Sequence, residues 1–161
     1  MALQQTMTAA TPPHECSADL LSRLGDAHDL LAQAIATLER ISLDPLDPTA
    51  LASARWRLSA ANRARRAVWE ECYRHLLPLV DRSTATALTE LKARDMEMAR
   101  ASVAHLARWP AAAAQAEWPD YCHASRAIRS QMSAVMQAEE RLLTPLFRMQ
   151  RLGSPRPALI A

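Results

Sequence analysis

Residues 17–42 read SADLLSRLGDAHDLLAQAIATLERIS and decide the fold class. Apolar residues recur in this stretch at alternating steps of four and three, which is the spacing of one face of an amphipathic helix. Ser17 is the expected N-cap, because its hydroxyl can accept a hydrogen bond from the first helical turn. The inward stripe consists of Leu24, His28, Leu31, Ile35 and Leu38. The stretch therefore predicts a long helix that packs on a core and carries one imidazole on its inner face.

Three more stretches show the same helical spacing. Asp47 followed by Pro48 is the expected N-cap and first residue of a second helix, because proline is favoured in a first turn. Pro78 is expected to kink or close the last turn of that helix. Asp81-Arg82-Ser83 is expected to form a short link and the cap of the third helix, which Pro110 ends. The four predicted helices span about 17–42, 48–80, 83–108 and 119–150.

Shorter segments surround and link these helices. Residues 1–16 lack helical periodicity and are expected to form a flexible lead. Residues 153–161 begin with Gly-Ser-Pro and are expected to form a tail. The alanine-rich stretch 111–117 lies between two prolines and is interpreted as a connection. One domain is therefore expected over residues 17–152.

Composition favours an all-α fold. The chain has 161 residues, of which 50% are hydrophobic and only two are glycine. Sheet proteins need more glycine in their turns, and Rossmann and P-loop folds need glycine-rich phosphate loops, so these classes are excluded. Amphipathic helices joined by short links favour an antiparallel up-down-up-down four-helix bundle.

Charge and hydropathy restrict which partners and which location can be expected. The 19 basic and 17 acidic residues give a net charge of +2, which is too balanced for a nucleic-acid-binding surface. No window approaches the ~18 consecutive apolar residues of a membrane span, and the N-terminus lacks the regions of a signal peptide. The three cysteines are widely spaced and are interpreted as free thiols in a reducing compartment. The expected location is the cytoplasm, with neither nucleic acid nor a membrane as partner.

Ligand-capable side chains lie on the inward stripes, one on each predicted helix. They are His28, Cys72, Asp95 and Glu139. A rise of about 1.5 Å per residue places all four roughly 13–20 Å from the same end of the bundle. Helical bundles build metal sites from such convergence, so the four are candidate ligands. Imidazole and carboxylates suit iron, and a thiolate favours zinc, so the candidate cofactor is non-haem iron or zinc.

The same layer also has a metal-free interpretation. Buried imidazole, thiol and carboxylate groups can satisfy one another through hydrogen bonds. Arg65 also lies on an inward stripe, where it needs a buried carboxylate or a route to water. The layer is therefore either a metal site or a structural polar layer.

Two helix ends carry related motifs. Residues 135–146 read VMQAEERLLTPL on the last predicted helix, and residues 75–79 read HLLPL at the end of the second. His28 lies in the sequence GDAHDLL on the first. In this order, the motifs resemble those of the hemerythrin-like (HHE cation-binding) domain family over roughly residues 20–150. The resemblance implies a four-helix bundle with a metal centre, in which His28 and Glu139 match ligand positions.

The ligand set departs from that family. Val68 and Val135 stand where the family has histidines, and Cys72 stands where it has a carboxylate. On the third helix, Asp95 is the nearest substitute for a histidine. The resemblance therefore implies a reduced, altered or lost di-iron site, and not an oxygen carrier.

Two functional hypotheses follow. The first is a metal-binding or redox- or ligand-sensing regulatory protein. The second is a metal-free interaction protein that forms a homodimer through tryptophan-bearing helix faces, because Trp56 and Trp69 lie off the predicted core stripe. An enzyme is disfavoured, since the sequence shows no nucleophile–base pair and no glycine-rich loop. Phosphotransfer is also disfavoured, because His28 lies on an apolar stripe and cannot reach a partner.

Overall fold

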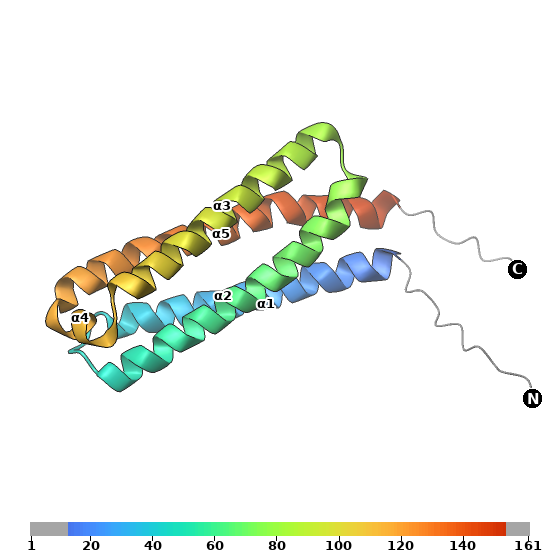
Figure 1. The fold of residues 1–161 in the computed structure, drawn as a ribbon. Coiled ribbons are helices and arrows are strands. Elements are labelled where there is room, and N and C mark those ends of the chain that lie inside the picture. The colour runs from blue at the N-terminus through green and yellow to red at the C-terminus, as the bar shows by residue number, and fades with distance from the viewer. Residues whose placement is uncertain (1–12, 154–161) are drawn as a thin grey trace, which may run out of the picture.

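The computed structural model describes residues 13–153, and the side chains of residues 18–150. The helices are α1 (Pro13–Ile41), α2 (Pro48–Leu76), the 3-10 turn η1 (Leu77–Leu79), α3 (Arg82–Arg108), α4 (Ala111–Ala116) and α5 (Trp118–Gly153) (Figure 1). No strand occurs within residues 13–153, so the predicted all-α class is confirmed. None of the described helices is long and apolar enough to cross a bilayer.

The four long helices lie alongside one another and alternate in direction (Figure 1). The described chain therefore begins and ends at the same end of the molecule. α1 packs against α2 and α5, α3 packs against α5, and α4 contacts α5 and α2 at the opposite end. Among the described residues, the backbones of α2 and α3 approach each other less closely than those of the other neighbouring long helices, although their side chains share a buried apolar cluster at one end.

Local side-chain chemistry fixes the starts of α2 and α3. The Asp47 carboxylate accepts hydrogen bonds from the backbone N–H groups of Thr49 and Ala50, at 2.9 and 3.1 Å, and Pro48 follows as the first helical residue. The Asp81 carboxylate accepts from the N–H of Thr84 at 2.8 Å. Each such cap contributes about 1 kcal/mol to helix stability. The predicted caps at Asp47 and Asp81 are confirmed.

Two elements differ from the sequence prediction. α1 begins at Pro13, so Ser17 lies inside the helix and is not its N-cap. A proline has no N–H to satisfy and its φ suits a first turn, which explains a start that apolar periodicity does not mark. The predicted connection over 111–117 contains the short helix α4. The rest of the predicted lead and tail, residues 1–12 and 154–161, lies outside the described residues.

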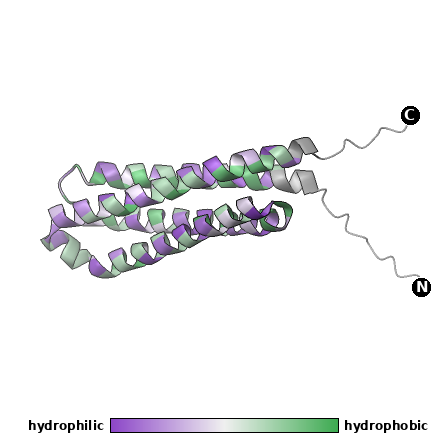
Figure 2. Ribbon diagram, turned by 90° about the horizontal axis from the view of Figure 1, so that it is seen from above, coloured by the Kyte–Doolittle hydropathy of each residue, from purple (hydrophilic) through white to green (hydrophobic). Residues whose placement is uncertain are grey.

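Three apolar clusters follow one another along the long axis. The terminal cluster contains Leu20, Leu24, Trp69, Cys72, Leu76, Leu88, Leu91, Leu143, Leu146 and Phe147. The middle cluster contains Leu31, Ile35, Met98, Met132 and Val135. The α4 cluster contains Leu38, Leu51, Ala54, Trp109, Ala114 and Tyr121. Figure 2 shows hydrophilic and hydrophobic segments alternating along each long helix, as expected when one face is buried.

The tryptophans of α2 have different environments. Trp56 is 68% exposed, in agreement with its predicted place off the core stripe. Trp69 is 1% exposed and belongs to the terminal cluster, which contradicts its predicted place off that stripe. Val68, which stands where the resembled family has a histidine, is only half-buried. Neighbouring positions on a helix differ by only ~100° around its axis. An apolar stripe therefore predicts the inner face of a helix only to within about one residue.

Candidate functional site

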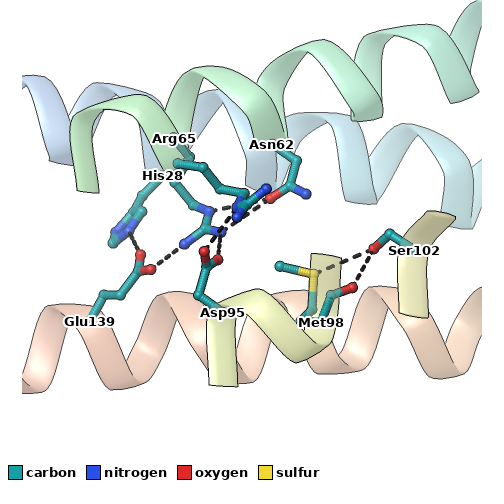
Figure 3. Close-up of polar contacts among 8 residues, drawn as sticks. His28, Asn62, Arg65, Asp95, Met98, Ser102 and Glu139 are labelled. Carbon is teal, nitrogen blue, oxygen red and sulfur yellow. Dashed lines mark hydrogen bonds and ion pairs between the residues drawn. The ribbon is translucent and has the colours of Figure 1, made fainter. Parts of the chain in front are cut away.

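A layer of buried polar side chains separates the terminal cluster from the middle cluster. Its centre is Arg65 of α2, whose guanidinium is fully buried. Arg65 donates through Nη1 to Oε1 of Glu139 on α5 and through Nη2 to Oδ1 of Asp95 on α3 (Figure 3). The side-chain oxygen of Asn62, one turn earlier on α2, accepts from Nε and Nη2 at 3.3 Å. One guanidinium thus joins α2, α3 and α5.

Two further side chains occupy the remaining carboxylate oxygens. Nε2 of His28 on α1 donates to Oε2 of Glu139 at 2.8 Å, and the imidazole is 15% exposed. Nε of Arg66 donates to Oδ2 of Asp95 at 2.8 Å. Each oxygen of the two carboxylates therefore has a partner. We call these residues, with Arg65 and Asn62, the Arg65 network.

The charges of the Arg65 network balance. Burial opposes the charge on Arg65, but the attraction of Glu139 and Asp95 outweighs it and raises the pKa of Arg65. Two guanidinium groups face two carboxylates, and His28 completes the set as a hydrogen-bond donor. Buried charges are tolerated when each is paired and hydrogen-bonded in this way.

The four predicted ligands divide into two groups. His28, Asp95 and Glu139 belong to the Arg65 network, so the predicted common depth is correct for these three. Cys72 lies in the terminal cluster with none of its surface exposed. Burial, followed by the negative charges of Glu139 and Glu71, raises the pKa of Cys72 to about 12. Where no metal ion contacts it, its sulfur is therefore a protonated thiol at neutral pH.

The layer fits a guanidinium better than it fits a metal ion. Arg65 lies between Asp95 and Glu139, and every carboxylate oxygen there already accepts a hydrogen bond. Within the part of the chain that the structure describes, no three or more His, Cys, Asp or Glu side chains are grouped so that they could hold a metal. A metal at this place would have to displace a buried, paired cation. The buried carboxylate that the sequence predicts for Arg65 is therefore present, and it is supplied by two residues, Asp95 and Glu139.

Long polar side chains span the gap between α2 and α3. Nζ of Lys92 lies 2.9 Å from Oε1 of Glu70 and 4.3 Å from the ring centroid of Tyr73. The Asp95 contacts to Arg65 and Arg66 span the same gap. Such side chains bridge a separation that close packing of small apolar residues cannot.

Beyond Asp95, toward α4, the gap becomes a cavity of about 320 Å³. This volume lies within the range of roughly 300–1,000 Å³ that is typical of small-molecule sites. Its walls come mainly from α2, α3 and α5. The lining residues are Leu38, Arg55, Leu58, Ser59, Asn62, Arg63, Arg66, Ala99, Ser102, Val103, His105, Leu106, Tyr121, Ser125, Ile128, Arg129 and Met132.

Arg129 of α5 lies in the wall of this cavity and is only 2% exposed. Nη1 donates to Oγ of Ser125 at 2.6 Å, whereas Nε has no hydrogen-bond partner. The sequence analysis did not single out Arg129, because an arginine is rarely buried in a helical core. The signal was the spacing of Tyr121, Ser125, Arg129 and Met132, which lie four, four and three residues apart on one buried face.

Comparison of the chain with family models, with curated proteins and with solved structures found no match. The hemerythrin-like resemblance therefore stays a prediction from sequence motifs.

Proposed function

We propose that this protein is a ligand-sensing regulatory bundle of hemerythrin-like topology, in which a buried arginine replaces the metal centre. The observation that carries the proposal is the cavity next to the Arg65 network. Asn62 and Arg66 belong to the network and also line the cavity. A ligand in the cavity therefore meets side chains that hold α2 and α3 together.

Because the cavity and the Arg65 network share these side chains, binding in the cavity can change the separation of α2 and α3. Arg66 is held by Asp95 on α3, and Asn62 supports the Arg65 guanidinium. A ligand that contacts either side chain changes the balance of interactions across the α2–α3 gap. Because close packing does not fix this gap, its width can respond to occupancy. The sensing signal is then a change in the separation of α2 and α3.

The experiment uses a neutral fluorescent probe, N-phenyl-1-naphthylamine, which brightens in apolar surroundings. We expect saturable enhancement with the full chain. Ala99→Phe fills the cavity and should abolish most of this enhancement, because Ala99 is half-buried in its wall. Ala93→Phe, on the exposed face of α3, is the matched control and should bind the probe as the parent does. No saturable binding, or equal binding by a folded Ala99→Phe variant, would contradict the proposal.

A second candidate is self-association through α2. Trp56 is 68% exposed, and large exposed aromatic side chains favour interfaces. Val103 and Leu106 of α3, which line the cavity, are also exposed. Sedimentation analysis of the parent chain and of Trp56→Ala tests this role. A homodimer that Trp56→Ala dissociates supports it, and a monomer at all concentrations rules it out.

A further inference from the structure

The cavity beside the Arg65 network is lined by cations without acidic residues. Four arginines line it, on α2 and α5, whereas no Asp or Glu is among its lining residues. Arg66 is already paired with Asp95. Arg55 donates to the backbone oxygen of Trp109 at 2.7 Å and lies over the Tyr121 ring. The electrostatic environment inside the cavity therefore favours an anion.

Arg129 is the buried one of these four arginines. Among the described residues, no carboxylate forms an ion pair with it, and its only hydrogen-bond acceptor is the Ser125 hydroxyl. Burial lowers the pKa of Arg129, and the charge of Glu39 counters this only in part. A planar guanidinium is suited to pair with a carboxylate or phosphate by two parallel hydrogen bonds. An anion in the cavity would supply the partner that the protein does not.

Apolar side chains also line the wall around Arg129. Ile128 and Met132 flank it on α5, and Leu58 lies on the α2 side. Apolar surface removed from water contributes roughly 25 cal/mol per Å² to binding. An inorganic ion would leave this surface uncovered, so the complementary ligand has an apolar body as well as a charged head.

We propose that the cavity binds a small organic anion, whose charged head pairs with Arg129 and whose apolar body packs against Leu58, Ile128 and Met132. This inference rests on the proposed function, because it requires that the cavity be the ligand site. It adds the chemical class of the ligand and the residue that recognises it.

The test compares three probes that share an eight-carbon chain, by calorimetric titration into the full chain. Octanoate and octyl phosphate carry the anionic head, and octanol does not. We expect octanoate or octyl phosphate to bind at least about tenfold more tightly than octanol, since a hydrogen bond to a charged group contributes that much. The tighter of the two anions identifies the head group as carboxylate or phosphate.

Variants test which side chain of the protein recognises the anionic head group. Arg129→Gln should lose about tenfold or more in affinity for the preferred anion and keep its affinity for N-phenyl-1-naphthylamine. Arg129→Lys should recover part of the loss. Arg126→Gln, on the exposed face of the same helix, is the matched control and should bind as the parent does. The Nε–H resonance of Arg129 should also shift when the anion is added to the unmodified protein.

The outcomes separate the two proposals. If N-phenyl-1-naphthylamine binds but octanol is as tight as both anions, the anion inference is overturned and the ligand-sensing function stands. The same holds if the Arg129 resonance does not move. If neither the neutral probe nor any eight-carbon compound binds, both proposals fail.

Discussion

Arg65 and Arg129 are both buried, with 0% and 2% of their surfaces exposed, but only Arg65 is paired with carboxylates. Arg65 of α2 lies at the centre of the polar layer, and Arg129 of α5 lies in the wall of the cavity. The pKa of Arg65 is raised by its partners, and the pKa of Arg129 is lowered by burial. One arginine therefore completes the internal structure, whereas the other is available to a ligand.

Replacing Arg65 should be strongly destabilising. Arg65→Met leaves one oxygen of Asp95 and one of Glu139 buried without a donor. Removing one partner of a buried ion pair lowers the free energy of unfolding by about 3–5 kcal/mol. Urea denaturation at neutral pH measures the loss. Arg63→Met, on the exposed face of α2, should change the free energy of unfolding by less than about 0.5 kcal/mol.

Metal removal should leave the protein unchanged. Arg65 already neutralises the carboxylates of Asp95 and Glu139, so the layer needs no divalent cation for charge balance. We expect the same melting temperature before and after treatment with a chelator. Iron(II) and zinc titrations should show no tight stoichiometric binding. Stoichiometric iron in protein purified without an affinity tag would contradict the proposed replacement of the metal centre.

Cys72 should resist alkylation in the folded protein. Its pKa of about 12 leaves almost no thiolate at pH 8, and its sulfur is buried. Iodoacetamide followed by peptide mass analysis should therefore find Cys122, which is half-buried, modified well before Cys72. Unfolding in urea should remove the difference. Equal rates in the native protein would show that the terminal cluster opens readily.

The same shift predicts a loss of stability in alkali. A thiol whose folded-state pKa is raised contributes stability that is complete below its ordinary value of 9.0. That contribution is lost as the pH rises from 9.0 toward about 12, because the unfolded chain releases the proton first. Cys72→Ala removes this dependence, and thermal unfolding from pH 8 to pH 11 compares the two chains. Parallel stability profiles would contradict the prediction.

The pKa of His105 should respond to changes of charge in the cavity. Burial, then the charges of Arg55 and Arg129, lower the pKa of His105 below its usual 6.5. Arg55→Gln should raise this pKa, measured by NMR titration of the imidazole protons, and the exposed His123 serves as the internal reference. An anion bound at Arg129 should raise it as well. Because the unfolded chain takes up this proton first, His105 reduces stability as the pH falls through 6.5.

How far the sequence predicts this structure depends on the range of the interactions. Asp47 with Pro48 and the capping carboxylate of Asp81 act within one turn, so both helix starts could be recognised. The requirement of Arg65 for a buried carboxylate was also evident from its place on an apolar stripe. Spacing along each helix placed His28, Asp95 and Glu139 at one depth. Which cation lies among them depends on contacts between helices, and spacing along one helix does not determine that.

The missed features have a common physical origin. Ile128 and Arg129 are adjacent on α5, and both line the cavity. Apolar character predicts a buried isoleucine there, but it gives no reason to expect a buried arginine beside it. The cavity itself arises because α2 and α3 do not pack closely, which no property of either helix alone predicts.

The bridge formed by Lys92, Glu70 and Tyr73 has a consequence for the conditions under which the protein works. Its charged groups are partly exposed to solvent, so dissolved ions weaken their attraction, more strongly as the Debye length falls below about 10 Å. The Arg23–Glu71 pair that joins α1 to α2 is exposed as well, but these two helices also pack closely and do not depend on it. Ionic strength therefore acts most strongly on the flank where α2 and α3 face each other. In concentrated salt, that flank is where amide hydrogen exchange should first accelerate.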